Sequence, residues 1–184
     1  MNNNMDNMNN MNNNMNNMNN INKYDLNTKW ILWCHSLTNN NWDTDSYNKI
    51  FDINNLYDYY SFIKNIDKNN YNDSMFFLMR ENILPIWEDE NNLNGCCLTI
   101  KIPNKNVKEE WDKLVLKCIS ETIHIDKEKY NNINGLSIIP KKEFNILKIW
   151  FKNNIEKIEN IDNIIKLYDP YIIKNNIKVK KNIY

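Results

Sequence analysis

The sequence is poor in the residues from which many catalytic and phosphate-binding sites are built. Only two glycines occur among 184 residues, so no glycine-rich loop is available to cradle a phosphate group. The two histidines, His35 and His124, belong to no recognisable Ser-His-Asp or similar nucleophile arrangement. We therefore expect a protein that is not an enzyme and has no catalytic residues.

The chain also lacks an excess of positive charge. Its formal net charge at pH 7 is zero, whereas a protein that binds long nucleic acids usually carries a basic excess, because neutralisation of phosphates supplies most of its affinity. Binding to long RNA through backbone charge alone is therefore not expected. A small ligand held in a defined pocket agrees better with a neutral chain.

Cysteine is present but lacks the spacing of a metal site. The four cysteines are Cys34, Cys96, Cys97 and Cys118, and no CxxC pair occurs, so we expect no zinc site and no cofactor. Neighbouring residues of a strand point to opposite faces, which disfavours a bridge between Cys96 and Cys97. The pattern predicts free thiols in a reducing cytosol.

Long apolar runs are missing as well. No stretch approaches the roughly 20 apolar residues that span a membrane, and residues 1–20 contain no apolar run of signal-peptide length. We expect a cytoplasmic protein without a membrane partner. Residues 1–22 are a low-complexity Met/Asn repeat, which buries too little apolar surface to fold. They predict a disordered tail before one folded domain at residues 23–184.

In the folded part, strand patterns are interspersed with helical ones. Apolar residues at helical spacing predict helices at Asn55–Ile66, Val107–Ile119 and Ile155–Tyr168. Asn106 and Glu109 match a capping box for the second of these helices, and Asn153 or Asn154 would cap the third. Runs of β-forming residues predict strands at Lys29–Cys34, Met75–Arg80, Cys97–Ile102 and Ile177–Lys180, and a hairpin of Leu136–Ile139 and Phe144–Phe151 around a turn at Pro140–Glu143.

This order predicts an α+β fold with an antiparallel sheet that is covered by helices on one face. The other face would be free for a ligand. Polar loops are expected at Asn39–Asp45 and Asp67–Asp73.

The strongest chemical signal is a tryptophan beside a carboxylate. Trp87 and Glu88 follow Pro85, and Trp42 lies in another polar loop. A carboxylate can accept both donors on the Watson–Crick edge of guanine, and a guanine made cationic by N7-methylation stacks well on indole rings. On these residues alone, an ordinary core role for Trp87 remains an alternative.

Further candidates lie in the predicted hairpin. Alternation along the second strand puts Leu147, Ile149 and Phe151 on one face and Lys148 and Trp150 on the other. If the first face meets the helices, Lys148 and Trp150 face the ligand, although Trp150 could equally belong to the core. Lys141 and Lys142 in the turn are either solvated or placed to reach phosphates.

Several ordered motifs resemble the eukaryotic translation initiation factor 4E family of mRNA cap-binding proteins. The resemblance runs from about Leu26 to about Trp150, with a weaker tail. The nearly gap-free blocks are Lys29-Trp30-Ile31-Leu32-Trp33, Trp42, Pro85-Ile86-Trp87-Glu88-Asp89-Glu90 with Gly95, Trp111 with Glu121, Gly135, and Ile149-Trp150.

The resemblance implies a curved antiparallel sheet with three helices on its convex face and a cap pocket on its concave face. It implies that Trp42 and Trp87 sandwich the 7-methylguanine base of a capped mRNA. Glu88 would hold the guanine edge and Trp150 would touch the methyl group. The remaining matched tryptophans, Trp30, Trp33 and Trp111, would be structural.

Departures from the family cluster at the expected phosphate site. Cys97, Lys141 and Ile146 stand where the family usually has Arg, Arg and Lys. Lys142 and Lys148 could compensate. We expect cap affinity to depend less on the triphosphate than is usual in the family.

A second departure concerns the convex face. There the resemblance implies binding of a scaffold initiation factor or a repressor through a Tyr-x-x-x-x-Leu-apolar helix. Leu26, Leu56 and Tyr60 stand at the corresponding positions, and Tyr can replace Trp as an amphipathic anchor.

The leading functional hypothesis is a monomeric protein that delivers capped mRNA to the translation initiation machinery. One alternative is a cap-binding repressor or specialised isoform. Another is an interaction protein of the same fold that has lost cap binding, although the retained Trp42, Trp87, Trp150 and Glu88 disfavour it.

Overall fold

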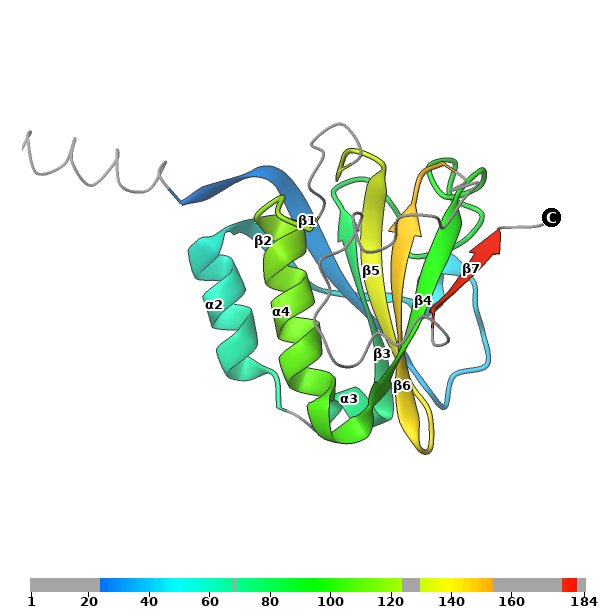
Figure 1. Cartoon of the computed structure of the whole chain (residues 1–184). Coiled ribbons are helices and arrows are strands. Elements are labelled where there is room, and N and C mark those ends of the chain that lie inside the picture. The colour runs from blue at the N-terminus through cyan, green and yellow to red at the C-terminus, as the bar shows by residue number, and fades with distance from the viewer. Residues whose placement is uncertain (1–23, 68, 124–129, 154–176, 182–184) are drawn as a thin grey trace, which may run out of the picture.

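A seven-stranded antiparallel sheet forms the centre of the protein (Figure 1). The computed structural model describes residues 24–67, 69–123, 130–153 and 177–181. The strand order is β2-β1-β3-β5-β6-β4-β7. The strands are β1 Asp25–Ser36, β2 Asn48–Asn55, β3 Ser74–Arg80, β4 Cys96–Pro103, β5 Ile133–Pro140, β6 Phe144–Phe151 and β7 Ile177–Lys181.

The described helices cover one face of this sheet. They are α2 Leu56–Asn65, the short α3 Asn70–Asp73 and α4 Val107–Ile119, together with the 3-10 turns η1 Thr44–Ser46 and η2 Asn104–Asn106. Figure 1 shows α2 and α4 side by side against the same side of the strands. We call the opposite side of the sheet the open face.

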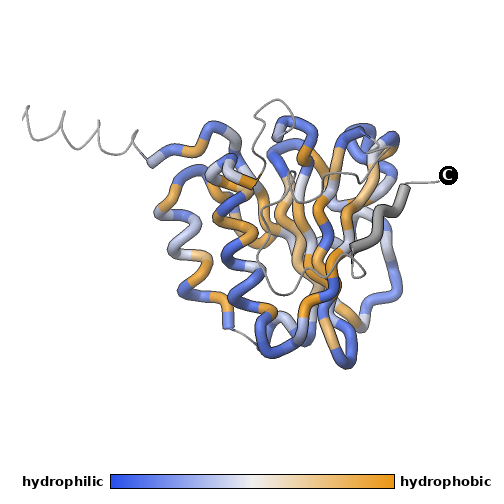
Figure 2. The backbone as a smooth tube through the Cα atoms, viewed as in Figure 1, coloured by the Kyte–Doolittle hydropathy of each residue, from blue (hydrophilic) through white to orange (hydrophobic). Residues whose placement is uncertain are grey.

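Strand alternation creates two separate apolar clusters, one on each face. The larger cluster joins the α4 residues Trp111 and Leu114 to strand residues such as Leu32, Leu98 and Ile149. In Figure 2, apolar stretches follow the central strands, whereas the loops and turns at the rim are polar. The smaller cluster lies on the open face and consists of Met75, Phe77, Met79, Ile83, Cys97 and Trp150, with Trp33, Tyr47, Trp87 and Ile139 packed against it.

The α+β class and the antiparallel sheet are confirmed, as are the predicted strands, the hairpin, and the first two helices. The division of β6 is also as predicted, because Leu147, Ile149 and Phe151 join the helix-side cluster and Trp150 joins the other. The predicted tail at residues 1–22 and the predicted helix at Ile155–Tyr168 lie outside the described residues.

Three local expectations require correction. The strand β2 was not expected, and α3 occupies part of the segment Asp67–Asp73 that was read as loop. The capping box at Asn106 is wrong, because η2 precedes α4 and leaves Asn106 with helical backbone angles (φ −108°, ψ 0°) and no side-chain cap bond. A capping side chain needs an extended backbone. Glu109 instead pairs with Lys113, at 2.5 Å.

The loop after β3 returns to the sheet through a close approach of two backbones at Gly95. A Cβ atom added to Gly95 would collide with the backbone carbonyl oxygen of Phe151, on the neighbouring strand β6. Neither backbone can move without disturbing the pairing of Cys96 with Phe151. Only glycine therefore allows the chain to enter β4 at this point.

We predict that Gly95→Ala lowers the free energy of unfolding by about 1–3 kcal/mol, the usual range for overpacking a tight site. Urea denaturation followed by circular dichroism measures the change. Asn94→Ala, at the exposed neighbouring position, is the control. Equal urea midpoints for Gly95→Ala and the unmodified protein would contradict the predicted collision.

Candidate ligand pocket on the open face

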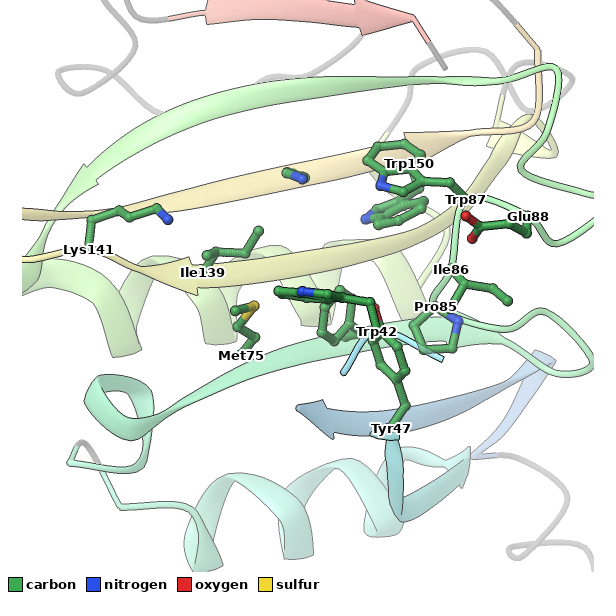
Figure 3. Close-up of a pocket in the computed structure, with 12 residues that line it drawn as sticks. Trp42, Tyr47, Met75, Pro85, Ile86, Trp87, Glu88, Ile139, Lys141 and Trp150 are labelled. Atoms are coloured by element: carbon green, nitrogen blue, oxygen red, sulfur yellow. The ribbon is translucent and has the colours of Figure 1, made fainter. Parts of the chain in front are cut away.

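The open face carries a cavity of about 440 Å³ above the smaller apolar cluster. Figure 3 shows that its side chains come from the loop after β1, from β3, from the loop after β3, and from the β5–β6 hairpin. Segments far apart in the sequence therefore meet here. The lining residues are Trp42, Tyr47, Met75, Phe77, Pro85, Ile86, Trp87, Glu88, Ile139, Lys141, Lys148 and Trp150.

Aromatic rings form a continuous chain along this cavity, and every ring of the chain except that of His35 lines it. Consecutive ring centroids lie 4.3–6.4 Å apart, so each ring is in contact with the next. The two pairs at the ends of the chain are stacked and the inner pairs are tilted or edge-to-face. The order of the chain is Trp42, His35, Tyr47, Phe77, Trp150 and Trp87.

Trp150 lies inside this chain rather than at its edge. Its side chain is buried, and its indole Nε1 donates a hydrogen bond of 2.9 Å to Ser137 Oγ on β5. Its ring is stacked on that of Trp87, with centroids 4.3 Å apart and an interplanar angle of 28°. Trp150 thus belongs both to the smaller apolar cluster and to the cavity wall, so the two roles expected as alternatives are combined.

Hydrogen bonds between polar side chains and the backbone hold the loop that carries Trp87 and Glu88. Asp89 accepts hydrogen bonds from the backbone nitrogens of Leu84 and Asn91, each at 2.8 Å. The amide of Asn92, which is buried, donates to the carbonyl oxygens of Leu84 at 3.0 Å and Ile86 at 2.8 Å. Sequence reasoning did not identify Asp89 or Asn92 as positioning residues, because their partners are backbone atoms that only the folded loop brings near.

Glu88 presents an exposed carboxylate at the cavity. Tyr47 lines the same cavity, and burial, followed by the negative charge of Glu88, raises the pKa of Tyr47 to about 12. The tyrosine hydroxyl therefore stays protonated at neutral pH. The cavity thus combines an acceptor carboxylate with aromatic surface, which suits a flat ligand that carries hydrogen-bond donors on one edge.

Positive charge enters the cavity from β6 and the hairpin. The Lys148 ammonium lies 5.0 Å from the ring centroid of Trp87 and 5.9 Å from that of Trp150, within cation–π range. Lys141 also lines the cavity. Lys142 is exposed and is absent from the lining, and its carbonyl oxygen accepts a hydrogen bond from the Asn104 amide. The structure thus brings two of the three predicted lysines to the cavity.

Cys97 supplies no charge in place of the arginine that the resemblance leads one to expect. It is fully buried beside Trp150, and burial raises the pKa of its thiol well above the usual range. The thiol therefore stays neutral at physiological pH. All four cysteines are free, as the sequence predicts.

The described part of the chain holds no group of three His, Cys, Asp or Glu side chains that could bind a metal ion. Nor does any described helix have the length and apolar character needed to cross a membrane.

The family model for eukaryotic initiation factor 4E matches residues 25–181. This chain belongs to that family. It is 25% identical over 183 residues to the eukaryotic translation initiation factor 4E of Dictyostelium discoideum, covering 88% of this chain and 70% of the relative. It is 28% identical over 138 residues to the factor from Saccharomyces cerevisiae, covering 71% and 63%.

Solved structures of initiation factor 4E proteins share the fold. One is the complex of Ascaris suum eIF4E-3 with the m7G cap, with a TM-score of 0.70 and 17% identity over 87% of this chain and 92% of that one. Another is schistosome eIF4E complexed with m7GpppG and 4E-BP, with a TM-score of 0.71 and 18% identity over 86% and 88%. At these low sequence identities, the structural similarity shows that the fold is shared.

On the helix side of this initiation factor 4E fold, the residues expected to bind a partner lie on β1 (Leu26) and on α2 (Leu56 and Tyr60). The Leu56 nitrogen donates to the Tyr24 carbonyl oxygen at 3.0 Å, which joins the start of β1 to the start of α2. Leu26 and Leu56 are half-buried and pack against the core, whereas Tyr60 is 61% exposed. Tyr57, also on α2, is 63% exposed and contacts the ring of Tyr24.

Proposed function

We propose that this chain binds the 7-methylguanosine cap of mRNA through Trp42, Trp87, Glu88 and Trp150. The observation that carries the proposal is that all four side chains line one cavity although they come from three separate segments. Membership of the initiation factor 4E family supports the proposal. Further support comes from the similarly folded Ascaris suum protein, which was solved in complex with m7G and m2,2,7G caps.

The chemistry of the cap suits the cavity. The methylated base is a flat cation, and cations are attracted to the faces of indole rings. Its N1–H and exocyclic amine donate in parallel, so the ionised Glu88 carboxylate can accept both in a charge-assisted pair. Trp150 lies beside Trp87, where it would contact the methyl group. Neutral guanine offers the same donors but no cationic ring, so it should bind more weakly.

The phosphates of the cap would meet Lys141 and Lys148, with Lys142 in the adjoining turn. A lysine acts on phosphate as a mobile point charge rather than as a fixed bidentate clamp. With a neutral thiol at Cys97 and an aliphatic side chain at Ile146, fewer cations act on the triphosphate than in most of the family. The triphosphate should therefore contribute less to affinity than is usual.

The proposed role is delivery of capped mRNA to the translation initiation machinery, as a cytoplasmic monomer without catalytic residues, cofactor or membrane partner. The surface of Leu26, Leu56 and Tyr60 would bind a scaffold initiation factor through a Tyr-x-x-x-x-Leu-apolar helix. Structures of similar fold contain 4E-BP or the 4E-binding protein Mextli. The alternative is that this chain is itself a cap-binding repressor or specialised isoform, which would hold capped mRNA without recruiting an active scaffold. A pull-down of scaffold against repressor partners would distinguish the two roles.

We predict that Glu88→Ala weakens binding of 7-methyl-GTP by about 10–100-fold, because hydrogen bonds to a charged acceptor contribute roughly 1.5–3 kcal/mol. Quenching of tryptophan fluorescence during titration measures the affinity, with GTP as the unmethylated comparison. Glu90→Ala removes an exposed carboxylate that does not line the cavity and should leave the affinity unchanged. Equal quenching by 7-methyl-GTP and GTP would refute cap binding and favour an interaction protein that has lost it.

We predict that Lys148→Met weakens binding of 7-methyl-GTP by about 3–10-fold, since a partly exposed charge pair contributes on the order of 1 kcal/mol. Binding of the nucleoside 7-methylguanosine should not weaken, because it carries no phosphate. Isothermal titration with both ligands, at two salt concentrations, measures the difference. Lys152→Met, at an exposed position outside the cavity lining, is the control. The phosphate role of Lys148 is wrong if both ligands weaken equally.

We predict that Tyr60→Ala weakens binding of a Tyr-x-x-x-x-Leu-apolar peptide by at least about tenfold, because aromatic anchors dominate such interfaces. Fluorescence anisotropy of a labelled peptide measures this. Affinity for 7-methyl-GTP should stay the same, since Tyr60 lies on the helix side. Lys64→Ala, also exposed on α2, is the matched control. Unchanged peptide affinity in Tyr60→Ala would exclude this surface.

A further inference from the structure

Trp42 lies in a loop that offers it little support of its own. The loop between β1 and η1 is exposed, and the Trp42 side chain is 54% exposed. Two short turns shape the loop, in which the side chain of Asn39 accepts from the Asn41 nitrogen and that of Asn41 accepts from the Asp43 nitrogen, both at 2.9 Å. These bonds fix the backbone locally but do not orient the indole.

His35 contacts both the backbone and the side chain at this position. Its Nε2 donates a hydrogen bond of 2.8 Å to the carbonyl oxygen of Asn41, the residue before Trp42. Its ring is stacked on the Trp42 indole, with centroids 4.4 Å apart and planes 3° from parallel. Among the rings in the described ranges, that of His35 is the only one stacked on Trp42.

His35 is itself rigidly placed. It lies on β1, where it pairs with Met75 of β3, and it is fully buried. Tyr47 packs on it at 4.8 Å between ring centroids. A buried side chain on a strand that is paired on both sides thus holds an indole in an exposed loop. Exposed loops are usually more mobile than strands.

We propose that His35 is a positioning residue that holds Trp42 in orientation for cap stacking. The inference rests on the proposed cap-binding function and adds a residue to that site. Holding the indole before the ligand arrives removes part of the ordering cost of binding. His35 does not line the cavity, so it acts through Trp42 and not on the ligand.

The second ring nitrogen of His35 provides a way to distinguish its effect on Trp42 from its effect on the stability of the fold. With its proton on Nε2, the ring leaves Nδ1 as an acceptor, and Nδ1 is buried without a hydrogen-bond partner among the described residues. An unpaired buried acceptor destabilises the folded state. Phenylalanine would remove that penalty and keep a stacked ring, but it would lose the bond to Asn41. Stability and cap affinity should therefore change in different directions.

The test is a double-mutant cycle between His35 and Trp42, read by isothermal titration with 7-methyl-GTP. His35→Leu should weaken binding by about tenfold, through loss of an aromatic pair and a hydrogen bond. In the Trp42→Ala background the same substitution should change affinity less than about twofold, because the residue through which His35 acts is gone. The affinity of the weakly binding double variant can be measured by NMR titration with millimolar 7-methyl-GTP.

His35→Phe is the second variant. It should recover part of the affinity lost in His35→Leu while its melting temperature equals or exceeds that of the unmodified protein. An equal loss in both Trp42 backgrounds would overturn the inference, as would full affinity in His35→Leu. Failure of the unmodified protein to bind 7-methyl-GTP is a different result, which would refute the proposed function. In that case, NMR relaxation of the Trp42 indole N–H without nucleotide would still decide whether the stack positions Trp42, because the indole should become more mobile in His35→Leu and an unchanged mobility would contradict the inference.

Discussion

The two-residue period of the strands is the constraint on which the core and the pocket both depend. On β6, Leu147 and Ile149 point to the helices, whereas Lys148 and Trp150 point away from them. A slip of one residue in the pairing of β6 with β4 or β5 would exchange these sets. It would bury a lysine under α4 and expose the core leucine. Stability of the core therefore fixes which side chains form the cavity.

The sheet buries apolar residues on both faces, and the helices that the structure describes cover only one of them. On the open face, aromatic rings pack against one another and cover the smaller apolar cluster. Trp87 is stacked on Trp150, and the Lys148 ammonium lies over it. The cavity therefore contains a cation of the protein itself beside its indole rings. Under the proposed function, the positively charged methylated base takes the place of Lys148 beside these rings, and Lys148 contacts the phosphates instead. Neutral guanine carries no positive charge and cannot replace the lysine in this way.

The elements that carry the strongest periodicity were predictable from the sequence. The α4 stripe around Trp111, the β5–β6 hairpin and the opposite faces of Leu147 and Trp150 all follow from local spacing. The strand β2 was missed because its apolar residues, such as Ile50 and Ile53, are few and stand among Asn, Asp and Lys. Its pairing with β1 supplies the order that its own sequence lacks.

The candidate site, too, was predictable from the sequence only in part. Trp42, Trp87, Glu88, Trp150, Lys141 and Lys148 were identified by residue type and resemblance, and they meet in one cavity. The residues that place them were not identified. Asn92 and His35 act on backbone carbonyls of loops, and a contact between a strand and a loop carbonyl leaves no pattern in the sequence. Lys142 was predicted to reach the phosphates but does not line the cavity. Its residue type indicated the charge, whereas the direction of its side chain depends on the geometry of the hairpin turn.

A crystal structure of the protein with 7-methyl-GTP would test the central claim most directly. The base should lie between the indole rings of Trp42 and Trp87, with its N1–H and exocyclic amine directed at the Glu88 carboxylate and its methyl group beside Trp150. A base bound at any other place, or one that leaves Trp42 and Glu88 without contact, would contradict the account.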